Sequence, residues 1–297
     1  MKGRLVVVSV CAALVAVGML VPAALNAVFD GLDLALGWMG AFWMVTLVSA
    51  ATGVLFILAF PHVSWQRGIV LVKDRIKFNL LSIRIFQDDL LNVLKSTGLT
   101  LAWNFAYIGL NLIPMVVLAA PFMIVWFQLN ALYAYAPLPV GERQLVTAEL
   151  AAGTDPAAVE FAAPAGVTLL RRVNLADAKE PMIHLDLRAD AAGRHELAFR
   201  SGGASVTKGF DVAERGRRLA AVRTSEPVAR FLAVEDPIVW FGEPVLPNSS
   251  FLRSIRIDYP PQPLGFLDGG EISIMIWFVI VSLAVGFGLK GVFGVEI

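Results

Sequence analysis

A charged stretch with helical periodicity lies between two long apolar segments, and no other feature constrains the fold as strongly. In this stretch, from Pro61 to about Gly98, apolar positions recur three, four or seven residues apart, at Val72, Ile76, Leu80, Ile83, Leu90 and Leu94. That spacing predicts a shared helical face. Six basic residues stand against three acids, and the length fits two helices joined by an elbow. We call this stretch the arm, and expect it to contact an apolar surface on one side and water or lipid headgroups on the other.

The composition predicts an integral membrane protein. The 297 residues are 57% hydrophobic and only 16% charged, whereas a soluble domain carries about a quarter charged residues. A net charge of zero argues against a nucleic-acid partner. Cys11 is the single cysteine, and the three histidines (His62, His184 and His195) lack ligand spacing. We therefore expect no disulfide, no metal site and no cofactor.

Four segments are apolar over the length that a bilayer requires. They are Leu5–Phe29, Gly37–Phe60, a segment from near Leu110 to Leu132, and Ile272–Leu289. A short acidic turn with Asp30 and Asp33 is expected after the first apolar segment. The first segment also fits a cleaved signal peptide, although its apolar body is long for one. The sequence divides into four predicted parts. Residues 1–35 form an anchor and an acidic turn, and residues 36–135 form a span, the arm and a second span. Residues 136–270 form an external domain, and residues 271–297 form the last span and the tail.

Polar residues within the predicted spans are candidates for a groove. They are Thr46, Ser49, Thr52, Asn104, Asn111 and Gln128. Hydrocarbon does not satisfy an amide, so such side chains should face protein or water. Close helix packing and hydrogen bonds between helices are the alternative explanation.

The segment 136–270 predicts a water-soluble β-domain. Between Ala136 and Glu271 lie 15 of the 24 basic and 18 of the 24 acidic residues. Short alternating runs such as Ile183–Arg188, separated by glycines, predict seven to nine strands in an antiparallel sandwich of immunoglobulin-like architecture. His184 and Asp186 share a face without a nucleophile, so we expect no enzyme. The basic group Arg215, Arg217, Arg218 and Arg223 is interpreted as a solvated hairpin rather than a lipid contact.

The distribution of basic residues predicts the topology. Lys2 and Arg4 precede the first span, the arm has a net charge of +3, and Lys290 follows the last span. Placing all three regions in the cytoplasm requires four spans with both termini inside. The predicted fold class is a membrane α-helical protein with four transmembrane helices and a cytoplasmic amphipathic arm, plus an extracytoplasmic all-β sandwich. The expected location is the inner membrane of a bacterium.

This order of elements resembles the core of the YidC/Oxa-type membrane protein insertases. Residues 37–132 and 272–289 match that core, and Leu112-Ile113-Pro114-Met115 is similar to the proline-containing entry of a span in that superfamily. The segments Leu80–Asp89 and Leu289–Val295 more closely resemble an uncharacterised family of bacterial membrane proteins. One departure is clear: neither Gly37–Phe60 nor Leu99–Leu132 contains the basic residue that bacterial insertases usually place in the groove.

The insertase resemblance implies a groove that lowers the cost of moving polar segments into the bilayer. The arm would then meet nascent membrane proteins or a ribosome, with candidate contacts at Arg67, Lys73, Lys77, Arg84 and Lys95. The alternative is a non-enzymatic scaffold or sensor whose external β-domain binds an envelope protein. A transporter subunit is least favoured, because the spans lack internal repeats and charges.

Overall fold

The computed structural model describes residues 2–176, 180–213, 218–227 and 241–295. The chain forms two compact units. One, here the helical unit, comprises Met1–Leu20, Val45–Val125 and Trp277–Ile297. The other, here the sandwich unit, comprises Val21–Met44 and Trp126–Ile276.

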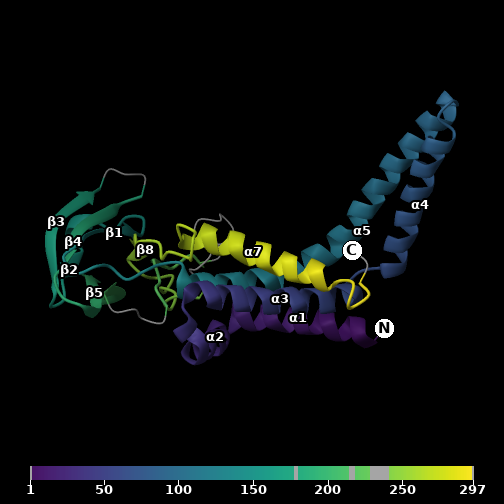
Figure 1. Ribbon diagram of the computed structural model, residues 1–297. Helices are drawn as coiled ribbons and strands as arrows, with labels where there is room; N and C mark the ends of the chain where they lie inside the picture. The colour runs from purple at the N-terminus through teal and green to yellow at the C-terminus, as the bar shows by residue number, and fades with distance from the viewer. Residues whose placement is uncertain (1, 177–179, 214–217, 228–240, 296–297) are drawn as a thin grey trace. The chain divides into compact units, whose positions relative to one another are not determined.

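Along the chain, the described helices come before and after the strands, and Figure 1 labels both. Their bounds are α1 Lys2–Leu20, α2 Pro22–Leu36, the 3-10 turn η1 Gly37–Met39, α3 Ala41–Val63, α4 Gln66–Ile85, α5 Leu90–Tyr133 and α7 Gly270–Leu289. In the described residues, α3, α5 and α7 are long and apolar enough to cross a membrane. The chain is therefore a multi-pass membrane protein. Leu5–Leu20 and Pro22–Met39 would add a fourth crossing if this broken pair is one span.

The first apolar segment is interrupted where a single span was expected. Val21 leaves the helical conformation (φ −134°, ψ 60°), and Pro22 opens α2. The cause is local, because a proline ring disfavours the helical conformation in the residue before it. The expected acidic turn is also helical, since Asp30 and Asp33 both lie within α2.

The arm is a helical hairpin, which confirms the predicted pair of helices with an elbow. It consists of α4 and the first part of α5 (Figure 1). At the elbow, the backbone N–H of Phe86 donates to the carbonyl of Ser82 at 2.9 Å. The Asp89 carboxylate then accepts from the N–H of Asn92 at 3.1 Å and caps α5.

The two helices of the arm meet along a seam that is more polar than predicted. The Ser96 hydroxyl of α5 donates to the Ser82 hydroxyl of α4 at 3.3 Å, and both Val72 and Asn79 of α4 are buried. The expected single apolar face is only partly right, because Leu80, Leu90 and Leu94 are exposed. Both helices carry apolar residues on more than one face, and the seam can cover only one of them.

Helix α5 joins the arm and the following span without a break. Its 44 residues contain Pro114 and Pro121. At 1.5 Å per residue the helix is about 66 Å long, roughly twice a bilayer's hydrocarbon core of about 30 Å. About half of α5 therefore extends beyond any single crossing.

The other segment of the chain folds into two antiparallel sheets. The strands are β1 Arg143–Leu150, β2 Glu160–Ala162, β3 Val167–Leu175, β4 Met182–Ala189, β5 Gly193–Ser201, β6 Ala204–Val212, β7 Val222–Thr224 and β8 Leu252–Ile257, with a 3-10 turn η2 at Pro156–Ala158. One sheet has the order β3-β4-β1-β8-β7 and the other β2-β5-β6. Eight strands in the described residues agree with the predicted seven to nine.

Both sheets contribute to one hydrophobic core, as a sandwich requires. Val146 and Leu185 come from the larger sheet, and Phe199 and Phe210 from the smaller. The strand order follows the immunoglobulin constant-type pattern, in which one sheet is ABED and the other CFG. Strands β1 to β6 take positions B to G, and β8 takes position A beside β1.

The two ends of the sandwich lie together. The Ala136 N–H donates to the Pro260 carbonyl, and the Gln262 N–H to the Ala134 carbonyl, each at 2.9 Å. Because the domain is inserted between α5 and α7, its first and last strands must lie close to each other. The pairing of β1 with β8 meets that requirement.

Candidate functional site

A cavity of about 490 Å³ lies within the helical unit, between α3, α5 and α7. Its walls are apolar except at a few positions. Residues that line it include Phe56, Phe60, Tyr107, Asn111, Ser282 and Gly286. The volume falls in the range of ligand-binding cavities, about 300–1,000 Å³. It is large enough for apolar side chains or part of an acyl chain.

Asn111 gives this cavity its distinctive chemistry. Its amide nitrogen donates to the Tyr107 carbonyl at 2.8 Å, within the same helix. Its Oδ1 is buried and has no hydrogen-bond partner among the described residues. A buried oxygen without a donor is costly, so a group that enters the cavity with an N–H or O–H would gain a bond there.

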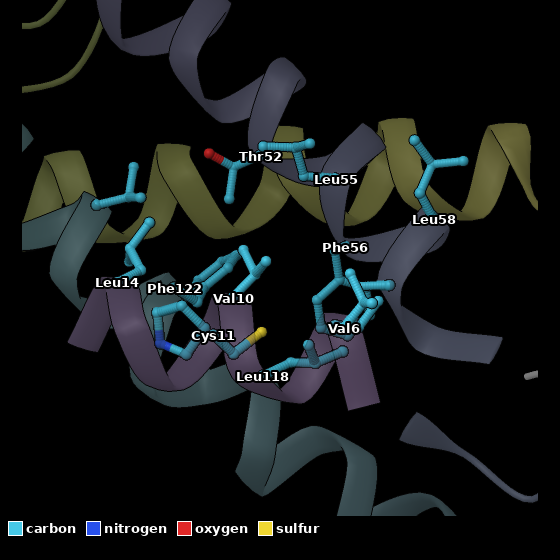
Figure 2. Close-up of a pocket in the computed structure, with 14 residues that line it drawn as sticks. Val6, Val10, Cys11, Leu14, Thr52, Leu55, Phe56, Leu58, Leu118 and Phe122 are labelled. Atoms are coloured by element: carbon cyan, nitrogen blue, oxygen red, sulfur yellow. The ribbon is translucent and has the colours of Figure 1, made fainter. Parts of the chain in front are cut away.

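A second cavity, of about 320 Å³, lies between α1, α3 and α5. Figure 2 shows Thr52 and Phe56 of α3, Cys11 of α1 and Leu118 of α5 around it. Its one hydroxyl, on Thr52, donates to the Val48 carbonyl at 2.7 Å. This cavity is therefore an apolar space that suits hydrocarbon.

Thr46 and Ser49 lie where α3 packs against α7 in the helical unit. The Trp277 indole N–H donates to the Thr46 hydroxyl at 2.8 Å, and the Ser282 hydroxyl donates to the Ser49 carbonyl at 2.9 Å. Ser49 itself is fully buried. These contacts match the helix-packing interpretation of the small and hydroxyl residues.

The six groove candidates do not converge on one site. Thr52 and Asn111 line different cavities. Asn104 is exposed on α5, and its amide donates to the Thr100 carbonyl. Gln128 belongs to the sandwich unit, where its Nε2 donates to Asn26 Oδ1 at 2.9 Å.

Four of the five candidate arm contacts are exposed. They are Arg67, Lys77, Arg84 and Lys95. Lys77 forms an exposed ion pair with Asp74 at 3.9 Å. Lys73 is half-buried, with its Nζ 6.0 Å from the ring centroid of Tyr107, so it lies near the base of the arm.

The arm also exposes large apolar side chains near its elbow. They are Phe78, Leu80, Leu81, Ile85, Phe86, Leu90, Leu91 and Leu94. Soluble surfaces rarely expose so much contiguous apolar area without a partner. Basic residues beside them give the arm an amphipathic surface.

A polar cluster in the sandwich unit was not anticipated from the sequence. Arg218 Nε donates to Asp30 Oδ1 at 2.9 Å, and its Nη2 donates to the Asn26 carbonyl at 3.1 Å. The Tyr133 hydroxyl donates to Asp33 Oδ1 at 2.5 Å. Burial lowers the pKa of Arg218, and the neighbouring Asp30 opposes this shift.

Arg218 is thus mostly buried, which corrects its interpretation as part of a solvated hairpin. Arg223 is only half-buried and donates to the Pro244 carbonyl at 2.8 Å. Arg215 and Arg217 lie outside the described residues. A sequence signal for the cluster existed: Asn26, Asp30 and Asp33 are four and three apart, which makes a polar stripe on an otherwise apolar helix.

Within the described chain, no group of three or more histidine, cysteine, aspartate or glutamate residues is placed to hold a metal ion. No protein-family model matches the sequence, and searches of curated proteins and of solved structures found no match.

Proposed function

We propose that this protein has an insertase-like core and assists the insertion or assembly of other membrane proteins. The observation that carries the proposal is the Asn111 oxygen in the cavity between α3, α5 and α7, which no described residue bonds. A polar group in the middle of a bilayer costs a few kcal/mol. A membrane-embedded acceptor beside an apolar cavity would reduce that cost for a client segment in transit.

The arm supports the same proposal. It is continuous with α5 and exposes apolar side chains near the elbow, with Arg84 and Lys95 beside them. Such a surface suits the apolar segment of a newly made membrane protein. The client would meet the arm first and the cavity between α3, α5 and α7 second.

The orientation that goes with this function follows the positive-inside rule. In our proposal the chain crosses the bacterial inner membrane four times, with both termini and the arm in the cytoplasm. Residues 136–270 then lie outside the cytoplasm. The protein acts without a cofactor and without enzymatic chemistry.

Site-specific photo-crosslinking in living cells tests the proposal. A photoreactive residue at Asn111 lines the cavity, and one at Ile113, 65% exposed on the same helix, is the matched control. Both positions lie at nearly the same depth. We expect Asn111 to crosslink to many newly made membrane proteins and Ile113 to few. Crosslinks from Asn111 to lipid only, or equal crosslinking at both positions, would refute the proposal.

A scaffold or sensor is the second candidate, and an edge strand of the sandwich favours it. Among the strands that the structure describes, β3 pairs only with β4, and Leu169 and Leu170 are exposed on it. An extended segment of an envelope protein would add to such an edge. A pull-down with the full chain tests this role. Leu170→Lys should lose the partner. Leu145→Lys, which changes an exposed residue of the central strand β1, should retain it.

A further inference from the structure

A lysine is buried in the β-sandwich, at a position where an apolar residue would be expected. Lys208 alternates with Val206 and Phe210 along β6, and all three are buried. Its side chain is 1% exposed. Burying an ammonium group is costly unless it is paired. Its Nζ donates to the Ala220 carbonyl and lies 3.2 Å from Oε2 of Glu243.

The carboxyl group of Glu243 is held in one orientation. Its Oε1 accepts the backbone N–H of Gly209 at 2.8 Å. A Cβ at position 209 would lie 2.6 Å from that oxygen, so a larger residue there would displace the carboxyl group from its present position. Its Oε2 faces Lys208, 3.2 Å from Nζ.

Asp211 is the third ionisable group of this cluster. Its side chain is buried, and Oδ1 has no hydrogen bond among the described residues, although Arg194 Nε lies 3.7 Å away. Its charge acts on both Lys208 and Glu243. Burial lowers the pKa of Lys208 and raises the pKa of Asp211. Both shifts favour the neutral forms, an amine and a carboxylic acid.

We propose that Lys208 and Glu243 join in an intramolecular amide bond, and that the buried carboxyl group of Asp211 promotes the reaction. Nζ of Lys208 attacks Cδ of Glu243, starting from the 3.2 Å contact between Nζ and Oε2 of the same carboxyl group. The Gly209 N–H stabilises the negative charge that develops on Oε1. The protons that the nitrogen loses pass to Oε2, which leaves as water. One C–N bond forms, one C–O bond breaks, and nothing is oxidised or reduced.

This bond would close the chain between residues 208 and 243. Strand β6 is an edge of the smaller sheet, and the Gly209 N–H on that edge already bonds Glu243. A covalent closure restricts the unfolded chain, as a disulfide does. The sandwich would then resist unfolding and proteolysis without a disulfide.

Peptide mapping and intact-mass measurement of the full chain, purified in detergent, test the proposal. We expect a branched tryptic peptide that joins Lys208 to Glu243, and a whole-chain mass one water below that of its unlinked form. Lys208→Met should abolish the branched peptide. Lys77→Met, which removes an exposed lysine paired with Asp74, should leave it unchanged.

The wild-type peptide map decides the question even if a variant fails to fold. Free Lys208 and Glu243 peptides, with no branched species, would show an ion pair only and overturn the proposal. Asp211→Asn tests the role of Asp211 separately, because it preserves both reacting side chains. The branched fraction should then form many times more slowly after synthesis, and formation at the wild-type rate would exclude Asp211 from the reaction.

Discussion

Arg218 Nε lies 2.9 Å from Oδ1 of Asp30, and the two residues are 188 positions apart in the sequence. Arg218 is 10% exposed and Asp30 21%. The pair fastens α2 to the segment that precedes β7, within the sandwich unit. An apolar helix is thereby bound to the β-domain through charges rather than through apolar contact alone.

Replacing Arg218 with methionine should destabilise the sandwich unit. The substitution leaves Asp30 partly buried without its cation, and loss of one partner of a buried pair costs about 3–5 kcal/mol. Thermal unfolding of the detergent-purified chain, followed by tryptophan fluorescence, measures the effect. Replacing Asp30 with leucine in the same chain should recover part of the loss, because no unpaired charge then remains.

The control for that experiment is Arg253→Met. Arg253 pairs with Glu226 at 3.1 Å on the surface of the same unit, and both side chains are exposed. Surface ion pairs contribute about 0–1 kcal/mol. If Arg218→Met were as mild as Arg253→Met, the Arg218–Asp30 pair would not hold α2 in place.

Gly53→Ala should disturb the packing of α3 against α7. A Cβ at this position would lie 2.4 Å from the backbone oxygen of Ser282, and backbone cannot move away as a flexible side chain can. The helices must separate, which weakens the bond from the Ser282 hydroxyl to the Ser49 carbonyl. We expect a lower thermal midpoint and a smaller yield of folded protein.

Gly109→Ala is the matched control for Gly53→Ala. A Cβ at Gly109 meets nothing within 4 Å, and the residue lies inside α5. Alanine favours a helix over glycine by about 1 kcal/mol. This variant should equal or exceed the wild type in stability, so a loss at both positions would argue against a packing effect.

Local patterns in the sequence predicted the elements that depend on neighbours in the chain. Alternation placed Ile183 and Leu185 in the core and left Arg188 exposed, as observed. Helical spacing and charge predicted the arm and its elbow. Both depend on a periodicity that is complete within one element.

Features that depend on distant residues could not be predicted in this way. No local pattern connects Asp30 with Arg218, and hydropathy alone did not register the break before Pro22. Lys208 carried a signal, since a charge at an inward position of an alternating strand breaks the pattern. Its partner Glu243 is distant in sequence, so only the fold reveals the pair.

Acid should weaken the β-domain partly through Asp190. The Thr168 hydroxyl and Arg188 donate to its carboxylate and hold its pKa below 3.8. Between the folded and unfolded pKa values the unfolded chain binds more protons, so stability rises with pH. The contribution is present above pH 3.8 and is lost as the pH falls through the folded pKa.

Asp190→Asn removes this dependence, and thermal midpoints measured above and below pH 3.8 test it. The variant should be slightly less stable than the wild type at neutral pH, and the difference should shrink in acid. The effect is small because Asp190 is exposed. A difference in thermal midpoint between wild type and variant that grew in acid would contradict this assignment.

The proposed orientation predicts which side chains a membrane-impermeant thiol reagent reaches in intact cells. In a Cys11→Ala background, Ser205→Cys reports on the exposed start of β6 and Gln87→Cys on the exposed elbow of the arm. The arm is basic, so in the proposed orientation it lies in the cytoplasm, as the positive-inside rule predicts. Ser205→Cys should react in intact cells, once the outer membrane is made permeable, and Gln87→Cys only after lysis. The reverse pattern would show that the topology is inverted. Reaction of both cysteines in intact cells would place the arm and the β-domain on the same side of the membrane. That result would contradict α5 as a single membrane crossing.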